Sequence, residues 1–142
     1  LHLAAHQAIA ELLVAIGLCP QKSADEVYES GFTRKFFPHG LGHLLGIMVH
    51  DVAGKQPGPE GGAFETLASD PWLRTQRVLA ERVVTTIEPG VYFIPELLEG
   101  IQGVDEAMLG ELLPLGGVRI EDNVVWQAGG LRNLSRPYSP NL

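Results

Sequence analysis

Residues 83–94 read Val-Val-Thr-Thr-Ile-Glu-Pro-Gly-Val-Tyr-Phe-Ile, and this stretch decides the fold. β-Branched side chains fill its first five positions, which favours a strand, and Pro89-Gly90 then interrupts the run. A second strand is expected over residues 91–94. Glu88 stands where the first strand ends, so its carboxylate is held between a stiff strand and a rigid turn.

Helical patterns precede this region, and further strands follow it. Residues 3–17 carry apolar side chains near helical spacing and end at a glycine. Ser23, with Glu26 three residues later, forms a capping-box pattern that predicts a second short helix. A strand pair is expected over residues 118–120 and 124–126. The predicted class is α+β, because the helices come first in the sequence and an antiparallel-looking sheet follows them.

The remaining segments carry weaker patterns. A short helix with loops is expected over residues 95–113, and the tail after Gly129 is expected to be irregular. His2 and His6 are four residues apart, a spacing that suits a metal, but solvent-facing or capping histidines are the favoured interpretation.

Composition limits the class of partner. The chain has 142 residues, a net charge of −7 and 45% hydrophobic residues, which fits one domain or part of one. The acidic balance argues against nucleic acid and anionic membranes as partners. No apolar run of about 18 residues and no signal peptide appears, and the single cysteine allows no internal disulfide. A cytoplasmic location is therefore expected. The chain begins with Leu1 rather than methionine, which indicates a missing N-terminal part.

The motif richest in candidate ligands is His39-Gly-Leu-Gly-His43, followed by His50-Asp51. Its two glycines disfavour a regular helix and allow the backbone to approach a partner closely. Imidazole is a common ligand of transition metals and a common acid–base group near neutral pH. A glycine-rich turn with surface histidines is the alternative interpretation.

Two carboxylates complete the candidate set. Glu88 ends the run described above, and Glu121 lies in Arg119-Ile120-Glu121-Asp122-Asn123, where Arg119 and Glu121 would share one face of a strand. Taken singly, these motifs could be a solvent-exposed glutamate and an exposed salt bridge. Together with a histidine, two glutamates form a ligand set that suits Mn²⁺, Co²⁺, Fe²⁺ or Zn²⁺. Two carboxylates that can bridge suggest two ions that activate one water.

In this order, the three motifs resemble the signatures of the pita-bread metallopeptidases, most closely those of the Xaa-Pro dipeptidases, or prolidases. The resemblance runs from the first helix to about Val125 and implies helices packed on a curved, mostly antiparallel sheet. It also implies a centre of two divalent ions, with Mn²⁺ favoured and Co²⁺, Zn²⁺ or Fe²⁺ as alternatives. The implied roles are metal ligation by His43, Glu88 and Glu121, catalysis by Glu88, His50 and His39, substrate binding by His50 and Arg74, and support of the metal site by Arg119.

The chain departs from the family pattern in three places. The family's two aspartate ligands belong upstream of the first helix and are absent, and neither Asp25 nor Asp51 has the right context to replace them. Ala80-Glu81-Arg82 stands where relatives usually carry Pro-Gly, and residues 98–112 look shorter than in relatives. Residues 1–142 are therefore expected to form the C-terminal part of the catalytic domain, without the N-terminal domain.

The activity that the resemblance implies is hydrolysis of Xaa-Pro dipeptides, in which a metal-activated water attacks the carbonyl before proline. Glu88 would move the proton, His50 would orient or stabilise the carbonyl oxygen, and Arg74 would hold the substrate's C-terminal carboxylate. A surface arginine is the alternative for Arg74. An Xaa-Pro aminopeptidase acting on longer peptides and a truncated, non-catalytic relative stay open as other functions. The full-length protein could form a homodimer.

Overall fold

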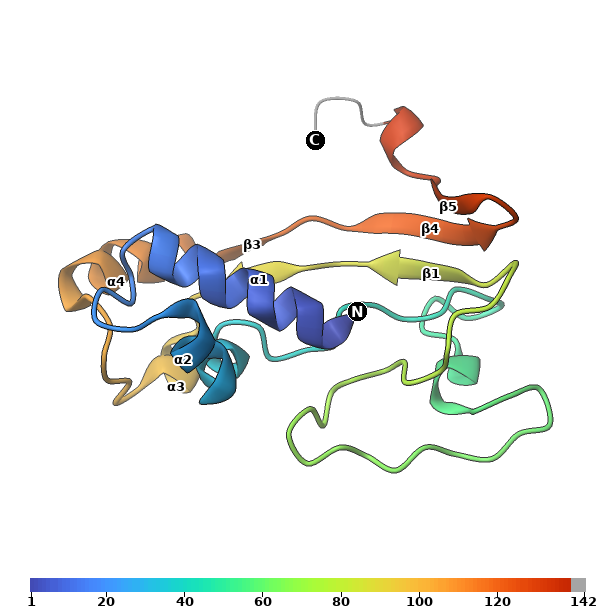
Figure 1. Cartoon of the computed structure of the whole chain (residues 1–142), viewed down its shortest axis with the longest axis horizontal. Coiled ribbons are helices and arrows are strands. Elements are labelled where there is room, and N and C mark those ends of the chain that lie inside the picture. The colour runs from blue at the N-terminus through green and yellow to red at the C-terminus, as the bar shows by residue number, and fades with distance from the viewer. Residues whose placement is uncertain (139–142) are drawn as a thin grey trace. The chain divides into compact units, whose positions relative to one another are not determined.

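A computed structural model of the protein describes residues 1–138, and the chain divides into two compact units. Unit 1 combines Leu1–Pro38 with Pro89–Arg119. Unit 2 combines His39–Glu88 with the chain from Ile120 onward. Each unit is therefore assembled from two segments that lie far apart in the sequence (Figure 1).

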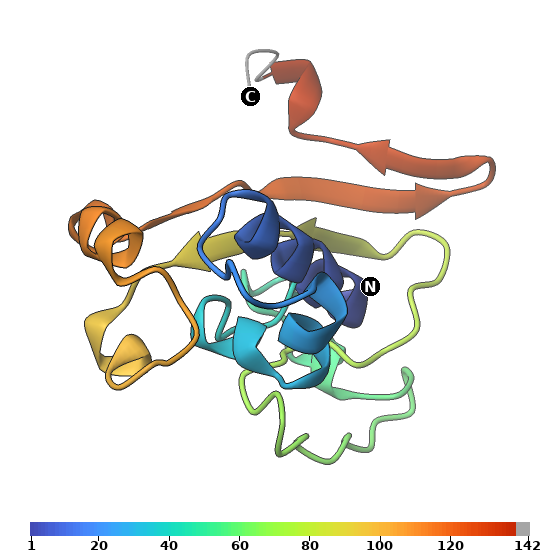
Figure 2. The same ribbon diagram turned by 60° about the vertical axis from the view of Figure 1, so that its left-hand side comes forward.

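Unit 1 begins with the helices that the sequence predicts. Helix α1 (His2–Ala15) buries Ile9 and Leu13, and α2 (Ala24–Glu29) starts at the predicted capping box. The Ser23 hydroxyl accepts the Glu26 amide at 3.3 Å, and the Glu26 carboxylate accepts the Ser23 amide at 2.8 Å. These bonds satisfy backbone donors that a helix start leaves open, so local sequence alone can fix this boundary. Figure 2 shows both helices as blue coiled ribbons near the N-terminus.

His6 corrects the expectation of a solvent-facing histidine. Its side chain is only 1% exposed, and its Nδ1 lies 2.8 Å from the hydroxyl oxygen of Thr33 in the 3₁₀ helix η1 (Phe32–Lys35). The His6 ring also packs on Phe37 at 5.2 Å between centroids. A polar ring with a hydrogen bond and aromatic neighbours is stable inside a core, so His6 holds α1 against η1.

The second segment of unit 1 supplies a two-stranded antiparallel sheet and two short helices. Strands β2 (Gly90–Tyr92) and β3 (Gly117–Arg119) pair with Val91 opposite Val118. Between them the chain forms α3 (Pro95–Leu98), α4 (Glu106–Leu112) and the 3₁₀ helix η3 (Leu113–Leu115), one α-helix more than the sequence predicted. The buried apolar residues of unit 1 are Ile9, Ala10, Leu13, Leu18, Cys19, Val27, Phe36, Phe37, Val91, Phe93 and Leu98.

Unit 2 is built on a three-stranded antiparallel sheet with the order β1-β4-β5 (Figure 1). Its strands are β1 (Val84–Ile87), β4 (Asp122–Gln127) and β5 (Gly130–Asn133), and it also contains the 3₁₀ helices η2 (Val52–Lys55) and η4 (Arg136–Tyr138). The predicted strand at 83–87 is thus confirmed, and every ladder in the described chain is antiparallel, as expected.

Two expectations about the C-terminal region are wrong. The predicted strands at 118–120 and 124–126 do not pair with each other, because β3 pairs with β2 and β4 pairs with β1. The tail is not irregular after Gly129, because β5 forms a hairpin with β4. Gly129 and Gly130 adopt φ angles of +101° and +133°, which allow the tight turn of that hairpin. Residues 139–142 of the predicted tail lie outside the described part.

Candidate metal centre

The His39–His43 motif lies against the edge of β1 that β4 does not occupy. The Glu88 amide donates to the Leu41 carbonyl at 2.7 Å, the Thr86 amide to the His43 carbonyl at 2.9 Å, and the Leu45 amide to the Val84 carbonyl at 3.0 Å. Residues 41–45 therefore run antiparallel to β1 and act as a further strand without regular pairing. This arrangement brings His43 beside the end of the strand that carries Glu88.

Gly42 makes this contact possible. A Cβ atom at Gly42 would lie 2.0 Å from the Thr86 carbonyl oxygen and 2.8 Å from its carbon. No side chain fits at such distances, so glycine is required for the backbone to lie flat on β1. The glycine-rich character that marks the motif in the sequence therefore has a structural cause here.

His43 and Glu88 face each other in a buried setting. The His43 Nε2 atom lies 3.5 Å from Glu88 Oε1, and their side chains are 5% and 9% exposed. The His43 Nδ1 atom lies 3.3 Å from the Leu44 carbonyl oxygen. The Nδ1 side of the ring therefore faces backbone, and Nε2 faces the Glu88 carboxylate. An imidazole nitrogen and a carboxylate oxygen that face each other in this way can share a cation, either a proton or a metal ion.

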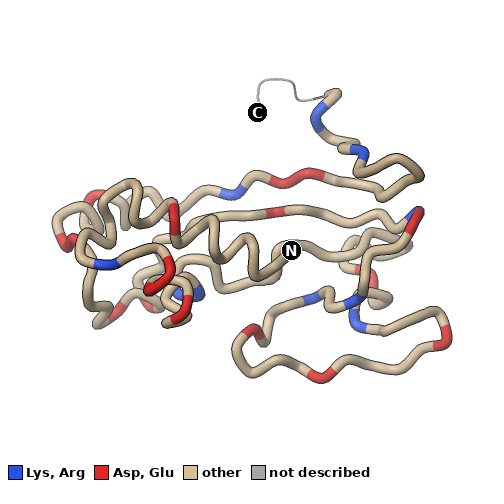
Figure 3. The backbone as a smooth tube through the Cα atoms, viewed as in Figure 1, with Lys and Arg blue, Asp and Glu red and all other residues tan. Residues whose placement is uncertain are grey.

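The strand register brings Glu121 to the same end of the sheet. Ile87 pairs with Asp122 in the last register pair between β1 and β4. Glu88 follows Ile87 and Glu121 precedes Asp122, so both glutamates lie at this end of the sheet, where acidic residues occur on both neighbouring segments (Figure 3).

The Glu121 side chain does not form a compact ligand group with His43 and Glu88. Glu121 is exposed, and within residues 1–138 no group of three ligand atoms that all lie within 4.8 Å of one another includes it. The backbone of Glu121 therefore lies at the same end of the sheet as Glu88, but its carboxylate does not join His43 and Glu88 in one ligand group.

His50 lies directly beside this group. Its ring packs edge-on against the His43 ring at 4.3 Å between centroids. The Asp51 amide donates to the Leu44 carbonyl at 3.0 Å. This bond closes the exposed loop 46–49 and keeps the chain around His50 next to the His43 segment. Partial desolvation and the positive charges of Arg74 and His43 lower the pKa of His50, while Glu88 and Glu121 oppose the shift. His50 is therefore favoured as the neutral ring near pH 7.

Arg74 and His39 belong to the same unit. Arg74 is exposed, and its charge reaches His50. Its backbone amide would lie 3.2 Å from a Cβ built on Gly40, so the segment around Arg74 packs closely on the histidine motif. The His39 Nδ1 donates to the Gly40 carbonyl at 2.8 Å, which fixes the ring beside its own loop.

Arg119 is the sequence candidate that unit 2 does not contain. It is the last residue of β3 in unit 1, where it pairs with Gly90. Ile120 and Glu121 lie between β3 and β4 and belong to neither strand, so Arg119 and Glu121 do not share one strand face as expected. The supporting role of Arg119 stays a prediction.

Thr85 and Thr86 are residues of the site that the sequence did not single out. The Thr85 hydroxyl donates to the His43 carbonyl at 2.8 Å, and the Thr86 hydroxyl contacts both His43 and Glu88. Threonine is common in strands, so β propensity already explained both residues. The two-residue spacing of Thr86 and Glu88 at the end of the predicted strand, which directs both side chains to the same side, was the signal that could have revealed this contact.

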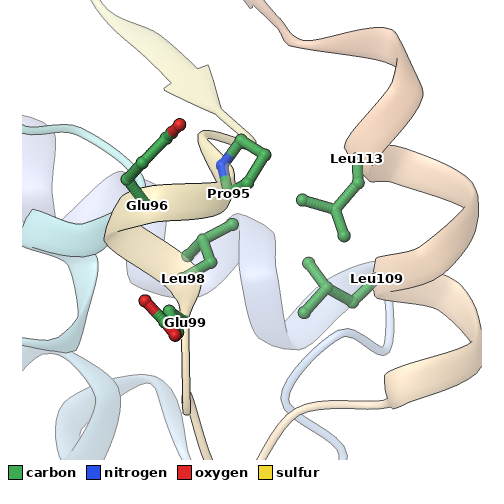
Figure 4. A pocket seen from close by; sticks show the side chains of 6 residues that line it. All are labelled: Pro95, Glu96, Leu98, Glu99, Leu109 and Leu113. Carbon is green, nitrogen blue, oxygen red and sulfur yellow. The ribbon is translucent and has the colours of Figure 1, made fainter.

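Unit 1 contains a hollow of a different character. It lies between α3 and α4, and Figure 4 shows Pro95 and Leu98 facing Leu109 and Leu113 across it. The carboxylates of Glu96 and Glu99 extend away from this gap (Figure 4). A gap with apolar walls and no converging polar groups lacks the chemistry of the His43–Glu88 group.

No helix within residues 1–138 combines the length and the apolar run needed to cross a membrane.

Comparison with known proteins gives consistent matches to peptidases. The family profile of metallopeptidase family M24 matches residues 1–128. Relatives include the Xaa-Pro dipeptidases of Marinobacter nauticus, which is 50% identical over 96% of this chain and 32% of its own length, and of Shewanella amazonensis, which is 44% identical over 99% and 33%. This chain therefore spans about a third of the length of these curated relatives.

Solved structures give the same result. Pseudomonas aeruginosa aminopeptidase PepP aligns with a TM-score of 0.63 and 30% identity over 95% of this chain and 25% of its own. Escherichia coli aminopeptidase P with the inhibitor Pro-Leu aligns with a TM-score of 0.61 and 30% identity, over 93% of this chain and 24% of that one. These neighbours agree with the predicted α+β class and pita-bread fold. The chain therefore belongs to metallopeptidase family M24.

Proposed function

We propose that this chain carries the histidine and glutamate part of the divalent-metal centre of an Xaa-Pro dipeptidase. One observation carries the proposal: His43 Nε2 and Glu88 Oε1 face each other at 3.5 Å in a buried setting at the end of β1. An imidazole and carboxylates are the donor set that Mn²⁺, Co²⁺, Fe²⁺ and Zn²⁺ accept, so the residues fit such an ion. Mn²⁺ is our first choice for the resident metal.

His43, Glu88 and Glu121 would hold the metal. When bound, divalent ions supply charge neutralisation and activate a water for attack on a carbonyl. Glu88 is suited to accept the proton of that water and to pass it to the departing proline nitrogen, because its carboxylate is fixed at the strand end. His50, neutral near pH 7, is suited to orient the substrate carbonyl from beside His43.

Arg74 supports a dipeptidase rather than an aminopeptidase. Its guanidinium charge acts on His50, so a substrate at His50 lies within electrostatic reach of Arg74. A guanidinium binds a carboxylate with two parallel hydrogen bonds, which suits the free C-terminus of a dipeptide. The curated relatives with 44% and 50% identity are also Xaa-Pro dipeptidases. We place the reaction in the cytoplasm.

The experiment is Co²⁺ binding by isothermal titration calorimetry, combined with an Ala-Pro hydrolysis assay. Glu88→Gln and His43→Ala should abolish both binding and turnover. Glu96→Gln, which changes an exposed glutamate of unit 1 in the same way, should bind as the parent does. A parent chain that binds no divalent ion would favour the other occupant of the His43–Glu88 gap, a proton, and with it the non-catalytic alternative.

A further inference from the structure

Thr86 lies between the two buried candidate ligands. Its side chain is 1% exposed, and its hydroxyl oxygen accepts the His43 amide at 2.9 Å. The same oxygen lies 3.1 Å from Glu88 Oε1 and 3.5 Å from the His43 carbonyl oxygen. A single hydroxyl therefore contacts the backbone of one candidate ligand and the carboxylate of the other.

The direction of the Thr86 hydroxyl proton follows from the acceptors around it. The His43 amide can only donate, so it uses a lone pair of the hydroxyl, whose own proton must go elsewhere. The His43 carbonyl already accepts the Thr86 amide at 2.9 Å and the Thr85 hydroxyl at 2.8 Å, which accounts for its two lone pairs. Glu88 Oε1 is the nearer remaining acceptor, so the Thr86 hydroxyl donates to Glu88.

We propose that Thr86 is a positioning residue that presets Glu88 relative to His43 for metal binding, an inference that rests on the proposed function. The hydrogen bonds run from the His43 amide to the Thr86 hydroxyl and from that hydroxyl to the Glu88 carboxylate. The first bond polarises the second, because a hydroxyl that accepts a hydrogen bond becomes a better donor. Glu88 is thereby held in one orientation before any cation arrives.

This arrangement should affect metal affinity more than folding. A carboxylate that is already oriented loses less freedom when it binds an ion, and partners of this kind typically change metal affinity about 10–100-fold when they are removed. Thr86→Val keeps the shape of the side chain and removes only the hydroxyl. Thr86→Ser keeps the hydroxyl and removes only the methyl group.

The test compares Co²⁺ affinity by calorimetry for the parent chain, Thr86→Val, Thr86→Ser and Thr33→Val. Thr33 is the matched control, because it is a buried threonine of unit 1 whose hydroxyl contacts a histidine ring, that of His6. We expect about 10–100-fold weaker binding for Thr86→Val and less than about threefold change for Thr86→Ser and Thr33→Val. Equal affinity of Thr86→Val and Thr33→Val, or a Thr86→Ser protein as impaired as Thr86→Val, would overturn the proposal.

A second readout needs no metal. Side-chain NMR couplings of Glu88 should report one rotamer in the metal-free parent and in Thr86→Ser, and averaging in Thr86→Val. Averaged couplings in the parent would overturn the inference even if Thr86→Val failed to fold. A parent that holds Glu88 in one rotamer but binds no Co²⁺ would contradict the proposed function and leave the hydrogen-bond geometry intact, so the two failures are distinguishable.

Discussion

Gly42→Ala is the substitution whose effect follows most directly from the structure. The new methyl group would lie 2.0 Å from the Thr86 carbonyl oxygen, and that oxygen belongs to strand backbone that cannot move alone. The clash is relieved only if residues 41–45 lift away from β1. The perturbation therefore acts on the whole contact between the histidine motif and the strand.

Three backbone hydrogen bonds set the size of the effect. They are accepted by the carbonyls of Leu41, His43 and Val84 at 2.7, 2.9 and 3.0 Å. With a net contribution of about 1 kcal/mol each, their loss lowers the free energy of unfolding by about 2–4 kcal/mol. Co²⁺ affinity should fall as well, because His43 moves away from Glu88.

Urea unfolding of Gly42→Ala measures this change, with Gly110→Ala as the control. Gly110 lies in α4, and a Cβ atom added there would meet no other atom within 4 Å, so alanine should stabilise the helix by up to about 1 kcal/mol. A Gly42→Ala protein within about 0.5 kcal/mol of the parent, with an unchanged hydrogen-exchange rate at the Thr86 amide, would refute the close-approach argument.

Three further predictions concern the helix cap, His50 and turnover. Ser23→Ala should cost about 1 kcal/mol of unfolding free energy in a urea titration, because the Glu26 amide loses its acceptor, and Ser23→Thr should restore most of it. NMR titration of the metal-free chain should give a pKa for His50 below the ordinary histidine value; Arg74→Gln should raise it and Glu121→Gln should lower it further. Because the pKa of His50 is lower in the folded chain, the unfolded chain takes up the His50 proton first as the pH falls. The free energy of unfolding should therefore decrease as the pH falls below the unfolded-state pKa of His50, until His50 is protonated in the folded chain as well. Residues 1–142 with Mn²⁺ should hydrolyse Ala-Pro far more slowly than the Marinobacter nauticus Xaa-Pro dipeptidase, since three candidate ligands compensate two divalent ions poorly; comparable turnover would mean that other residues complete the site.

Local features of the fold were predictable from the sequence because their causes are local. The capping box at Ser23 needs only residues three apart, and the strand at Val84–Ile87 needs only a β-branched run and a breaker. Strand pairing was predicted incorrectly because it depends on partners far along the chain. The sequence around Glu121 looks like a hairpin, yet its two flanks pair with β2 and β1 instead.

The candidate site was also predictable only where its signals are local motifs. The motifs singled out His43 and Glu88, and the pairing of residues 41–45 with β1 then brings the two together. Thr86 was missed because a threonine in a strand is already explained by β propensity. The burial of His6 was missed because its partner, Thr33, is 27 residues away and no local pattern connects the two.

The central claim is that His43 Nε2 and Glu88 share a divalent metal ion. Crystals grown with Mn²⁺ and measured near the manganese absorption edge test it most directly. We predict an anomalous peak about 2.0–2.2 Å from both His43 Nε2 and a Glu88 carboxylate oxygen, with the Glu121 side chain rotated toward it. The claim would be contradicted if Mn²⁺ bound elsewhere at full occupancy and no peak appeared between His43 Nε2 and Glu88, with these two groups still facing each other directly.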